Sequence, residues 1–317
     1  MSTPLPPVDR TDLETAALRT EQRNPATIDL DLLDTAGILA KINEQDRTVP
    51  AKVAVAIPAI TRAVDLIVER MERGGRLIYA GAGTSGRIGV LDASECPPTF
   101  GVSPQTVVGL IAGGPQAVFG EIPMAEDDGA SARRDLAAIQ LSANDTVMAL
   151  AASGRTPYCA GALAYAAEIG AGRVSLACNP GAKISALAEV AIEVDTGPEA
   201  LQGSTRMKAG TAEKLVVNMV TTTTMIRLGH VYSNMMASMK ANNRCNSKIY
   251  ERRLRVFQEV TGCADRAEAV RIFEQAGTTR CAIVMQMAGV SAEQAEQALC
   301  QANQAVRKAI AIAQGMN

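Results

Sequence analysis

Short apolar runs alternate with stretches of helical spacing through the middle of the chain. The runs cover residues 76–80, 106–112, 145–152, 173–178 and 190–194. Runs that are nearly continuous in apolar character and separated by helices are typical of strands buried on both faces of a parallel sheet. The sequence therefore predicts an α/β fold, a doubly wound parallel sheet with helices on both faces.

Three segments are expected around this sheet. Residues 1–49 should form an N-terminal arm and a helix, since residues 1–30 are polar and contain proline. Residues 50–235 carry the alternating pattern and should form one α/β domain. From 246 to 317 only helical spacing remains, and glycines interrupt it, which predicts a small all-helical C-terminal module. These glycines are Gly262, Gly277 and Gly289.

Composition argues against several classes of function. The formal net charge is −2, only 3% of residues are aromatic and no basic block occurs, so no nucleic-acid partner is expected. No stretch reaches the roughly 18 apolar residues that a membrane span needs. The first ten residues also lack the apolar segment of a signal peptide. We therefore expect a cytoplasmic protein that acts on a small molecule away from membranes.

Cysteine and histidine usage indicates neither a disulfide framework nor a metal centre. The seven cysteines are odd in number, scattered and never spaced as CxxC, so they are interpreted as small buried thiols in a reducing compartment. His230 is the only histidine and lies in an apolar neighbourhood, which favours a structural role. No metal and no cofactor are expected.

The turn after the first strand, Gly81–Arg87, matches GxGxxG. A dinucleotide site would need an acidic residue at the end of the next strand, but residues 110–114 contain none, so that function is disfavoured. A smaller anion fits better, because Gly83, Thr84 and Ser85 would offer backbone N–H and hydroxyl donors at a helix start. A plain glycine-rich turn is the alternative.

A second polar turn, Ser153–Pro157, follows the third strand. Thr156 suits a helix N-cap and Pro157 the first helical position, so capping alone could explain it. Because the carboxyl ends of parallel strands meet at one edge, Ser153, Arg155 and Thr156 are also candidate ligands for the same anion. Two hydroxyl-bearing turns suit a sugar phosphate better than a nucleotide.

Two glutamates are candidate acid–base groups. Pro97-Pro98 should end the preceding helix and place Glu95 near the carboxyl edge of the sheet, where apolar neighbours would desolvate it and raise its pKa. Glu126 should open a helix after the second strand. Two carboxylates in contrasting environments can act as an acid and a base. Solvated helix-end carboxylates are the alternative for each.

At these residues the chain resembles the N-acetylmuramic acid 6-phosphate etherases, whose fold is a sugar isomerase (SIS) domain. The resemblance covers nearly the whole chain. The stretches are Leu18–Pro25, Ile42–Asp46, Gly81–Thr99 (GAGTSGRIGVLDASECPPT), Ala151–Tyr158 (AASGRTPY) and Gly203–Thr211 (GSTRMKAGT). The stretch Gly203–Thr211 is also similar to the glucokinase regulatory protein.

The resemblance implies a reaction. The open-chain aldehyde of the sugar phosphate acidifies its C2 proton, the C3 lactyl ether is eliminated as D-lactate, and water adds to give N-acetylglucosamine 6-phosphate. It also implies that Glu95 is the proton donor and Glu126 the second catalytic group. The implied phosphate ligands are Thr84, Ser85, Ser153 and Thr156, and Ser204, Thr205 and Lys208 are expected to line the pocket further, unless that segment is only a helix cap.

Other functions remain open at this point. A sugar-phosphate-binding regulator or a sugar-phosphate isomerase would use similar turns. Two segments also depart from the family pattern, Gly120–Met124 before Glu126 and Asn242–Ile249. A homodimer is expected from the apolar residues of 211–228 and 235–239, although a core helix and a buried methionine cluster explain them equally well.

A metal-free reaction predicts insensitivity to chelators. D-lactate release from N-acetylmuramic acid 6-phosphate should be unchanged after dialysis against EDTA, because neither glutamate needs a metal to transfer a proton. Loss of lactate release that a divalent cation restores would reveal a metal site that the sequence does not indicate.

Overall fold

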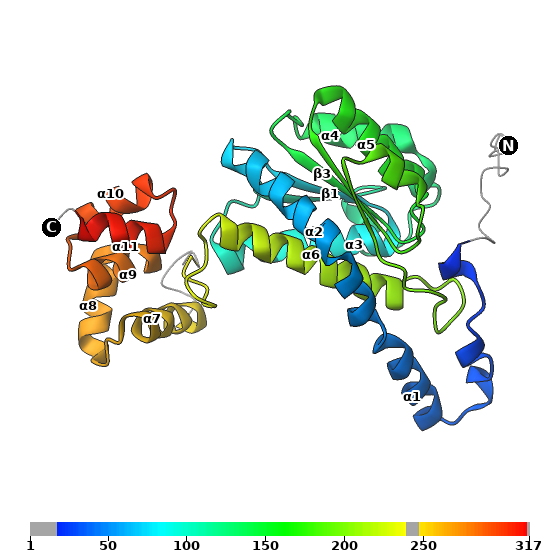
Figure 1. The fold of residues 1–317 in the computed structure, drawn as a ribbon, viewed down its shortest axis with the longest axis horizontal. Coiled ribbons are helices and arrows are strands. Elements are labelled where there is room, and N and C mark those ends of the chain that lie inside the picture. Colours follow the sequence, from blue (N-terminus) through cyan, green and yellow to red (C-terminus); the bar gives the residue numbers. More distant parts are fainter. Residues whose placement is uncertain (1–17, 239–246, 316–317) are drawn as a thin grey trace.

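The computed structural model describes residues 18–238 and 247–315 (Figure 1). Its centre is a five-stranded parallel sheet with the strand order β2-β1-β3-β4-β5. The predicted strands are confirmed as β1 (Leu77–Gly81), β2 (Val107–Ile111), β3 (Thr146–Ala151), β4 (Gly172–Ala177) and β5 (Val190–Glu193). The α/β class with a helical C-terminal region is therefore confirmed.

Helices cover both faces of the sheet, as predicted (Figure 1). Alternate residues of a strand point to opposite faces, and in β1 Leu77 and Tyr79 pack in one core while Ile78 and Ala80 pack in another. Three helices cover the first face: α2 (Val49–Glu72), α3 (Gly83–Phe100) and α6 (Lys208–Arg227). Two cover the second: α4 (Gly129–Ala138) and α5 (Pro157–Ile169).

The long helix α6 is a core element. Val216, Val217 and Val220 are fully buried in the first core, and α6 packs against both α2 and α3. Its apolar residues were expected to form either a homodimer interface or a core helix. Most of them are buried within the chain, as in a core helix. Exposed apolar side chains remain at Met219 and Ile226.

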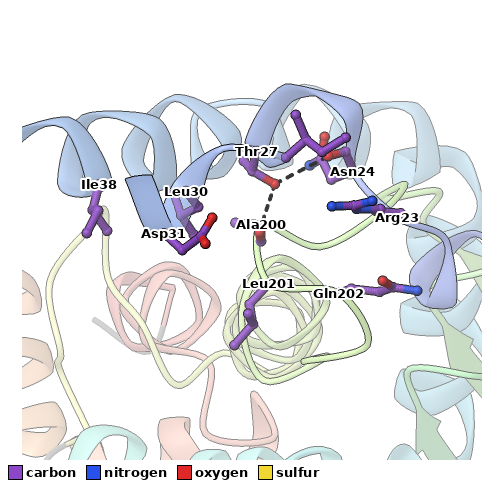
Figure 2. Close-up of a pocket in the computed structure, with 10 residues that line it drawn as sticks. Arg23, Asn24, Thr27, Leu30, Asp31, Ile38, Ala200, Leu201 and Gln202 are labelled. Carbon is purple, nitrogen blue, oxygen red and sulfur yellow. Dashed lines mark hydrogen bonds between the residues drawn. The ribbon is translucent and has the colours of Figure 1, made fainter. Parts of the chain in front are cut away.

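The described part of the N-terminal segment, from residue 18 onward, is docked against the α/β domain instead of extending as a free arm. Thr20 is fully buried, and its backbone N–H donates to Asn179 Oδ1 at 3.3 Å. Thr27 Oγ1 donates to the carbonyl oxygen of Ala200 at 2.8 Å. Figure 2 shows Thr27 and Ala200 among the residues that line a pocket between this segment, the start of α1 (Thr35–Asp46) and residues 200–202. None of the predicted site residues lines this pocket.

The C-terminal helices form their own core, and Figure 1 shows them set apart from the sheet. The helices are α7 (Ser247–Thr261), α8 (Arg266–Ala276), α9 (Thr279–Ala288), α10 (Ala292–Gln301) and α11 (Val306–Gln314). Gly262, Gly277 and Gly289 follow three of them at positive φ, as the glycine spacing predicted. These separate cores support the proposed division into 50–235 and 246–317. Most of the departing segment 242–249 lies outside the described residues.

The described cysteines are free thiols; five are buried, and Cys300 is exposed, which corrects the expectation that all are buried. His230 is half-buried, and burial together with the nearby Arg280 lowers its pKa to about 4, so it is a neutral imidazole at physiological pH. No helix in the described ranges is both long and apolar enough to cross a membrane.

Asp92 ties three elements of the first core together. Its buried carboxylate accepts hydrogen bonds from Tyr79 Oη on β1 at 2.9 Å and from Asn218 Nδ2 on α6 at 2.6 Å. The Asp92→Ala variant would leave both donors without this partner. We expect it to lose about 3 kcal/mol of unfolding free energy, measured by urea denaturation.

The matched control for this experiment is Asp65→Ala. Asp65 makes an exposed ion pair with Arg227 at 2.9 Å, and an exposed pair contributes about 0–1 kcal/mol. Equal losses in the two variants would contradict a special role for the Asp92 network.

Candidate functional site

The two predicted hydroxyl-bearing turns lie side by side. β1 and β3 are parallel neighbours, with Gly81 opposite Leu150, so the turns that follow them occupy the same edge of the sheet. The chain leaves β1 toward β2 on one side and later returns to β3 on the other. This is the topological switch point at which open α/β sheets bind ligands.

The first turn presents an uncapped helix N-terminus. Helix α3 begins at Gly83, and its N-cap residue Ala82 provides no side-chain hydrogen bond. Gly83 has a φ of +52°, which favours glycine. Gly86 lies so close to the strand that an added Cβ would be 2.7 Å from Gly81 O. The free backbone N–H groups and the positive end of the helix dipole therefore favour an anion here.

The second turn also leaves polar groups available. Thr156 is the N-cap residue of α5 with Pro157 following it, as predicted, but its side chain makes no capping hydrogen bond. Ser153 Oγ accepts a hydrogen bond from the backbone N–H of Arg155 at 3.3 Å. The explanation that this turn serves only as a cap is therefore weakened, because the Thr156 hydroxyl is not used for capping.

Ser85 makes a contact that the sequence did not indicate. Its side chain is buried and lies against α6, where Ser85 Oγ is 2.8 Å from Glu213 Oε1. Glu213 is fully buried, and its second oxygen, Oε2, has no hydrogen-bond partner among the described residues. Burial raises the pKa of Glu213 to about 8. Sequence reasoning did not single out Glu213, because no motif marks this position on the second turn of α6.

The start of α6 approaches the first turn, but Lys208 does not reach it. A Cβ added at Gly210 would lie 3.5 Å from Thr84 Cγ2, so the two helix starts are in contact. Lys208 is buried on another side, with Nζ 3.5 Å from Gln45 Oε1 on α1. Its expected role in lining the pocket stays a prediction.

Glu199 caps the start of α6. Its carboxylate accepts hydrogen bonds from the backbone N–H groups of Lys208 and Ala209 at 2.8 and 2.9 Å. Ser204 and Thr205 are partly exposed and precede the helix without capping it. They therefore stay candidates for the pocket on position alone.

Glu126 faces the first turn across a pocket of about 440 Å³. It lies on a 3-10 turn, Ala125–Asp127, which follows Met124 at a φ of +61°. The expectation that Glu126 opens a helix is thus wrong, since α4 begins at Gly129. Its side chain is exposed to the pocket, yet partial burial raises its pKa, and the carboxylates of Asp127 and Glu121 raise it further. Gly83 and Thr84 line the same pocket.

Arg87 holds the loop that carries Glu126. From the second turn of α3, its guanidinium donates to the carbonyl oxygens of Val118 and Gly120, both at 3.0 Å. These two bonds connect the glycine-rich turn to the segment 112–127 and so shape the pocket. The departing segment Gly120–Met124 lies within this loop.

Glu95 lies elsewhere, and two expectations about it are wrong. The double proline does not end α3, which continues to Phe100 with Gly101 as its left-handed cap. Glu95 is exposed, so it is not enclosed by apolar neighbours. It is twelve residues beyond Gly83, which places it about 18 Å along the helix axis from the first turn. Glu126 lines the pocket at the first turn, and Glu95 is not among the residues that line it.

Comparisons with known proteins agree with this architecture. Residues 59–167 match the family described as the glucokinase regulatory protein N-terminal SIS domain. The N-acetylmuramic acid 6-phosphate etherases of Yersinia pestis (strain Pestoides F) and Yersinia pseudotuberculosis (serotype O:1b) are each 52% identical over 295 residues, covering 93% of this chain and 99% of theirs.

Among solved structures, a phosphoheptose isomerase from Francisella tularensis aligns with a TM-score of 0.47 at 16% identity, covering 62% of this chain and 100% of that one. The Vibrio vulnificus NanR protein complexed with ManNAc-6P aligns with a TM-score of 0.45 at 16% identity, covering 62% and 66%.

Fold and motifs together define a SIS-type α/β protein with an uncapped helix N-terminus at its switch point. At this identity and coverage, the chain belongs to the N-acetylmuramic acid 6-phosphate etherase family.

Removing the Arg87 side chain should free the Glu126 loop. We expect Arg87→Ala to speed hydrogen–deuterium exchange of the amides in residues 118–127 by about tenfold or more, because each bond from a charged donor contributes about 1.5–3 kcal/mol. Arg133→Ala is the control. Arg133 on α4 makes an exposed ion pair with Glu168 on α5 and no bond to the loop that carries Glu126. Unchanged exchange in the loop would show that Arg87 does not hold it.

Proposed function

We propose that this protein cleaves the D-lactyl ether of N-acetylmuramic acid 6-phosphate, giving N-acetylglucosamine 6-phosphate and D-lactate. The observation that carries the proposal is the 52% identity over nearly the full length of curated etherases. The uncapped start of α3 and the raised pKa of Glu126 on the same pocket also support the proposal. Cytoplasmic action is part of the proposal.

The phosphate is placed at the switch point. The N–H groups at the start of α3 and the hydroxyls of Thr84, Ser153 and Thr156 are the proposed donors, and Arg155 adds a positive charge. The guanidinium of Arg155 makes no hydrogen bond or ion pair with the described residues, so it is available to an anion. These donors are largely neutral, which lets a chain of net charge −2 bind phosphate.

Elimination then proceeds from the open-chain aldehyde. A carboxylate removes the C2 proton, the electron pair forms the C2–C3 double bond, and the C3–O bond breaks. An acid protonates the departing lactate oxygen. Water next adds its oxygen to C3 of the unsaturated aldehyde while C2 regains a proton. Glu126 lies on the pocket beside the proposed phosphate site, and its raised pKa makes its carboxylate a stronger base than an ordinary glutamate.

Glu95 is proposed to come from a second copy of the chain. Within one subunit it lies about 18 Å along α3 from the anion site, so it cannot act on the substrate held there. The three helices that cover the first face of the sheet carry exposed apolar side chains: Leu91 (54% exposed) on α3 itself, Val55 (81%) on α2 and Ile226 (48%) on α6. Leu91 is one helical turn from Glu95. A homodimer that buries this surface would deliver Glu95 to the partner's pocket.

The reaction itself is tested by incubating the purified protein with N-acetylmuramic acid 6-phosphate. D-Lactate and N-acetylglucosamine 6-phosphate should form in equal amounts. A regulator would release neither product, and an isomerase would convert a sugar phosphate without releasing lactate. Folded protein that yields no lactate would refute the proposal.

Mixing two inactive variants tests the shared site. Glu95→Gln and Glu126→Gln should each lower kcat by about a hundredfold or more. In a mixed dimer one pocket keeps both glutamates, so co-refolding equal amounts should restore about a quarter of wild-type activity. Absence of any rescue in dimers shown to be mixed would place both glutamates in one subunit and contradict the proposed arrangement.

The pH profile should report Glu126. A base with a raised pKa is protonated up to a higher pH, so kcat/KM should fall on the acid side at a pH above the ordinary glutamate value of 4.5. Asp127→Asn removes a neighbouring negative charge and should move this acid limb to lower pH, with a smaller shift for Glu121→Gln. An acid limb that stays in place in both variants would assign it to another group.

A further inference from the structure

A fully buried carboxyl group lies directly behind the anion-binding turn. Glu213, on the second turn of α6, has no solvent exposure, and its Oε1 is 2.8 Å from Ser85 Oγ. Its Oε2 is buried and has no hydrogen-bond partner in the described part of the chain. A buried carboxylate with one unsatisfied oxygen is costly, whereas a carboxylic acid with an unsatisfied carbonyl oxygen costs much less.

We infer that Glu213 is a positioning residue that acts as a neutral acid, donating its proton to Ser85 Oγ so that the Ser85 hydroxyl is free to donate to the substrate phosphate. The inference rests on the proposed function, since it concerns the same anion site. At a separation of 2.8 Å either oxygen can carry the shared proton. The direction of this bond therefore decides whether Ser85 is a phosphate donor.

The charge state of Glu213 fixes that direction. As an ionised group Glu213 can only accept, so Ser85 must turn its hydrogen inward and cannot donate to phosphate. The buried negative charge would also repel the phosphate. As a neutral acid Glu213 removes both obstacles. Burial holds its pKa at about 8, which keeps the neutral form dominant at physiological pH.

The surroundings of Glu213 supply no compensating charge. The titratable groups that it influences are the thiols of Cys159 on α5 and Cys178 after β4, and burial raises the pKa of both, so they stay neutral. Two further acids, Glu126 and Glu199, act on the same thiols. Among the described residues, no lysine, arginine or histidine contributes to the pKa of Glu213.

Phosphate binding should therefore be linked to proton binding by Glu213. Below about pH 8 the acid is neutral and the Ser85 hydroxyl is available. As the pH rises above 8, Glu213 ionises and the site loses affinity. Conversely, a bound phosphate dianion favours the neutral acid, so binding at pH 8–9 takes up protons.

The experiment is calorimetric titration with N-acetylglucosamine 6-phosphate, the proposed product. Its phosphate is dianionic above pH 7, because the second pKa of a phosphomonoester is about 6, so the ligand itself does not titrate. The wild-type affinity should fall about tenfold between pH 7.5 and 9.5. Titrations at pH 8.5 in buffers of different ionisation enthalpy should show uptake of a fraction of a proton.

Glu213→Gln is the discriminating variant. The glutamine amide can donate to Ser85 at any pH, so affinity at pH 7.5 should remain within about twofold of wild type, while the loss above pH 8 and the proton uptake should both disappear. The pKa of Lys208 is also lowered by burial. Any effect of its deprotonation on phosphate affinity would be the same in the wild type and in Glu213→Gln. Ser85→Ala should lose about tenfold in affinity at pH 7.5 and also become insensitive to pH around 8.

Each outcome decides the question. Equal pH profiles in wild type and Glu213→Gln, or wild-type binding without proton uptake at pH 8.5, overturn the role of Glu213 and leave the etherase proposal intact. The wild-type proton uptake needs no variant, so a misfolded Glu213→Gln protein would not block the test. Failure of the sugar phosphate to bind at all at pH 7.5 overturns the anion site and this inference with it.

Discussion

The close approach of α3 to the sheet is the constraint on which the site depends. Three glycines allow it: a Cβ at Gly86 would lie 2.7 Å from Gly81 O, one at Gly89 would lie 2.9 Å from Tyr79 Cβ, and one at Gly109 would lie 2.6 Å from Val90 Cα. These separations are shorter than side-chain contacts tolerate. The absence of side chains lets the helix N-terminus sit at the end of β1, where its free N–H groups meet the turn after β3.

Local pattern in the sequence was sufficient to predict the architecture. Apolar runs and glycine punctuation depend on near neighbours in the chain, and they located the strands and the ends of the C-terminal helices. The juxtaposition of the two hydroxyl-bearing turns followed from the rule that parallel strands end at one edge. Motifs that resemble a known family identified the chemistry, which the residues alone left open between several sugar-phosphate functions.

The errors arose where tertiary packing decides. Two prolines usually end a helix, but α3 continues through Pro97 and Pro98 to Phe100. Glu95 lies far from the sheet edge because twelve residues of α3 separate it from Gly83. The turn gave no sign that the Ser85 hydroxyl also contacts Glu213, more than a hundred residues later. Lys208 is buried toward α1. Such long-range contacts leave no periodic signal.

The C-terminal helices have a hydrophobic core of their own, and none of its buried residues belongs to the cores around the sheet. Cooperativity of unfolding follows shared burial. Heating should therefore melt the chain in two calorimetric steps, and a single melting temperature would not describe it. A ligand bound at the switch point would raise the melting temperature of the α/β domain only. The melting temperature of the C-terminal helices would not depend on whether substrate is bound.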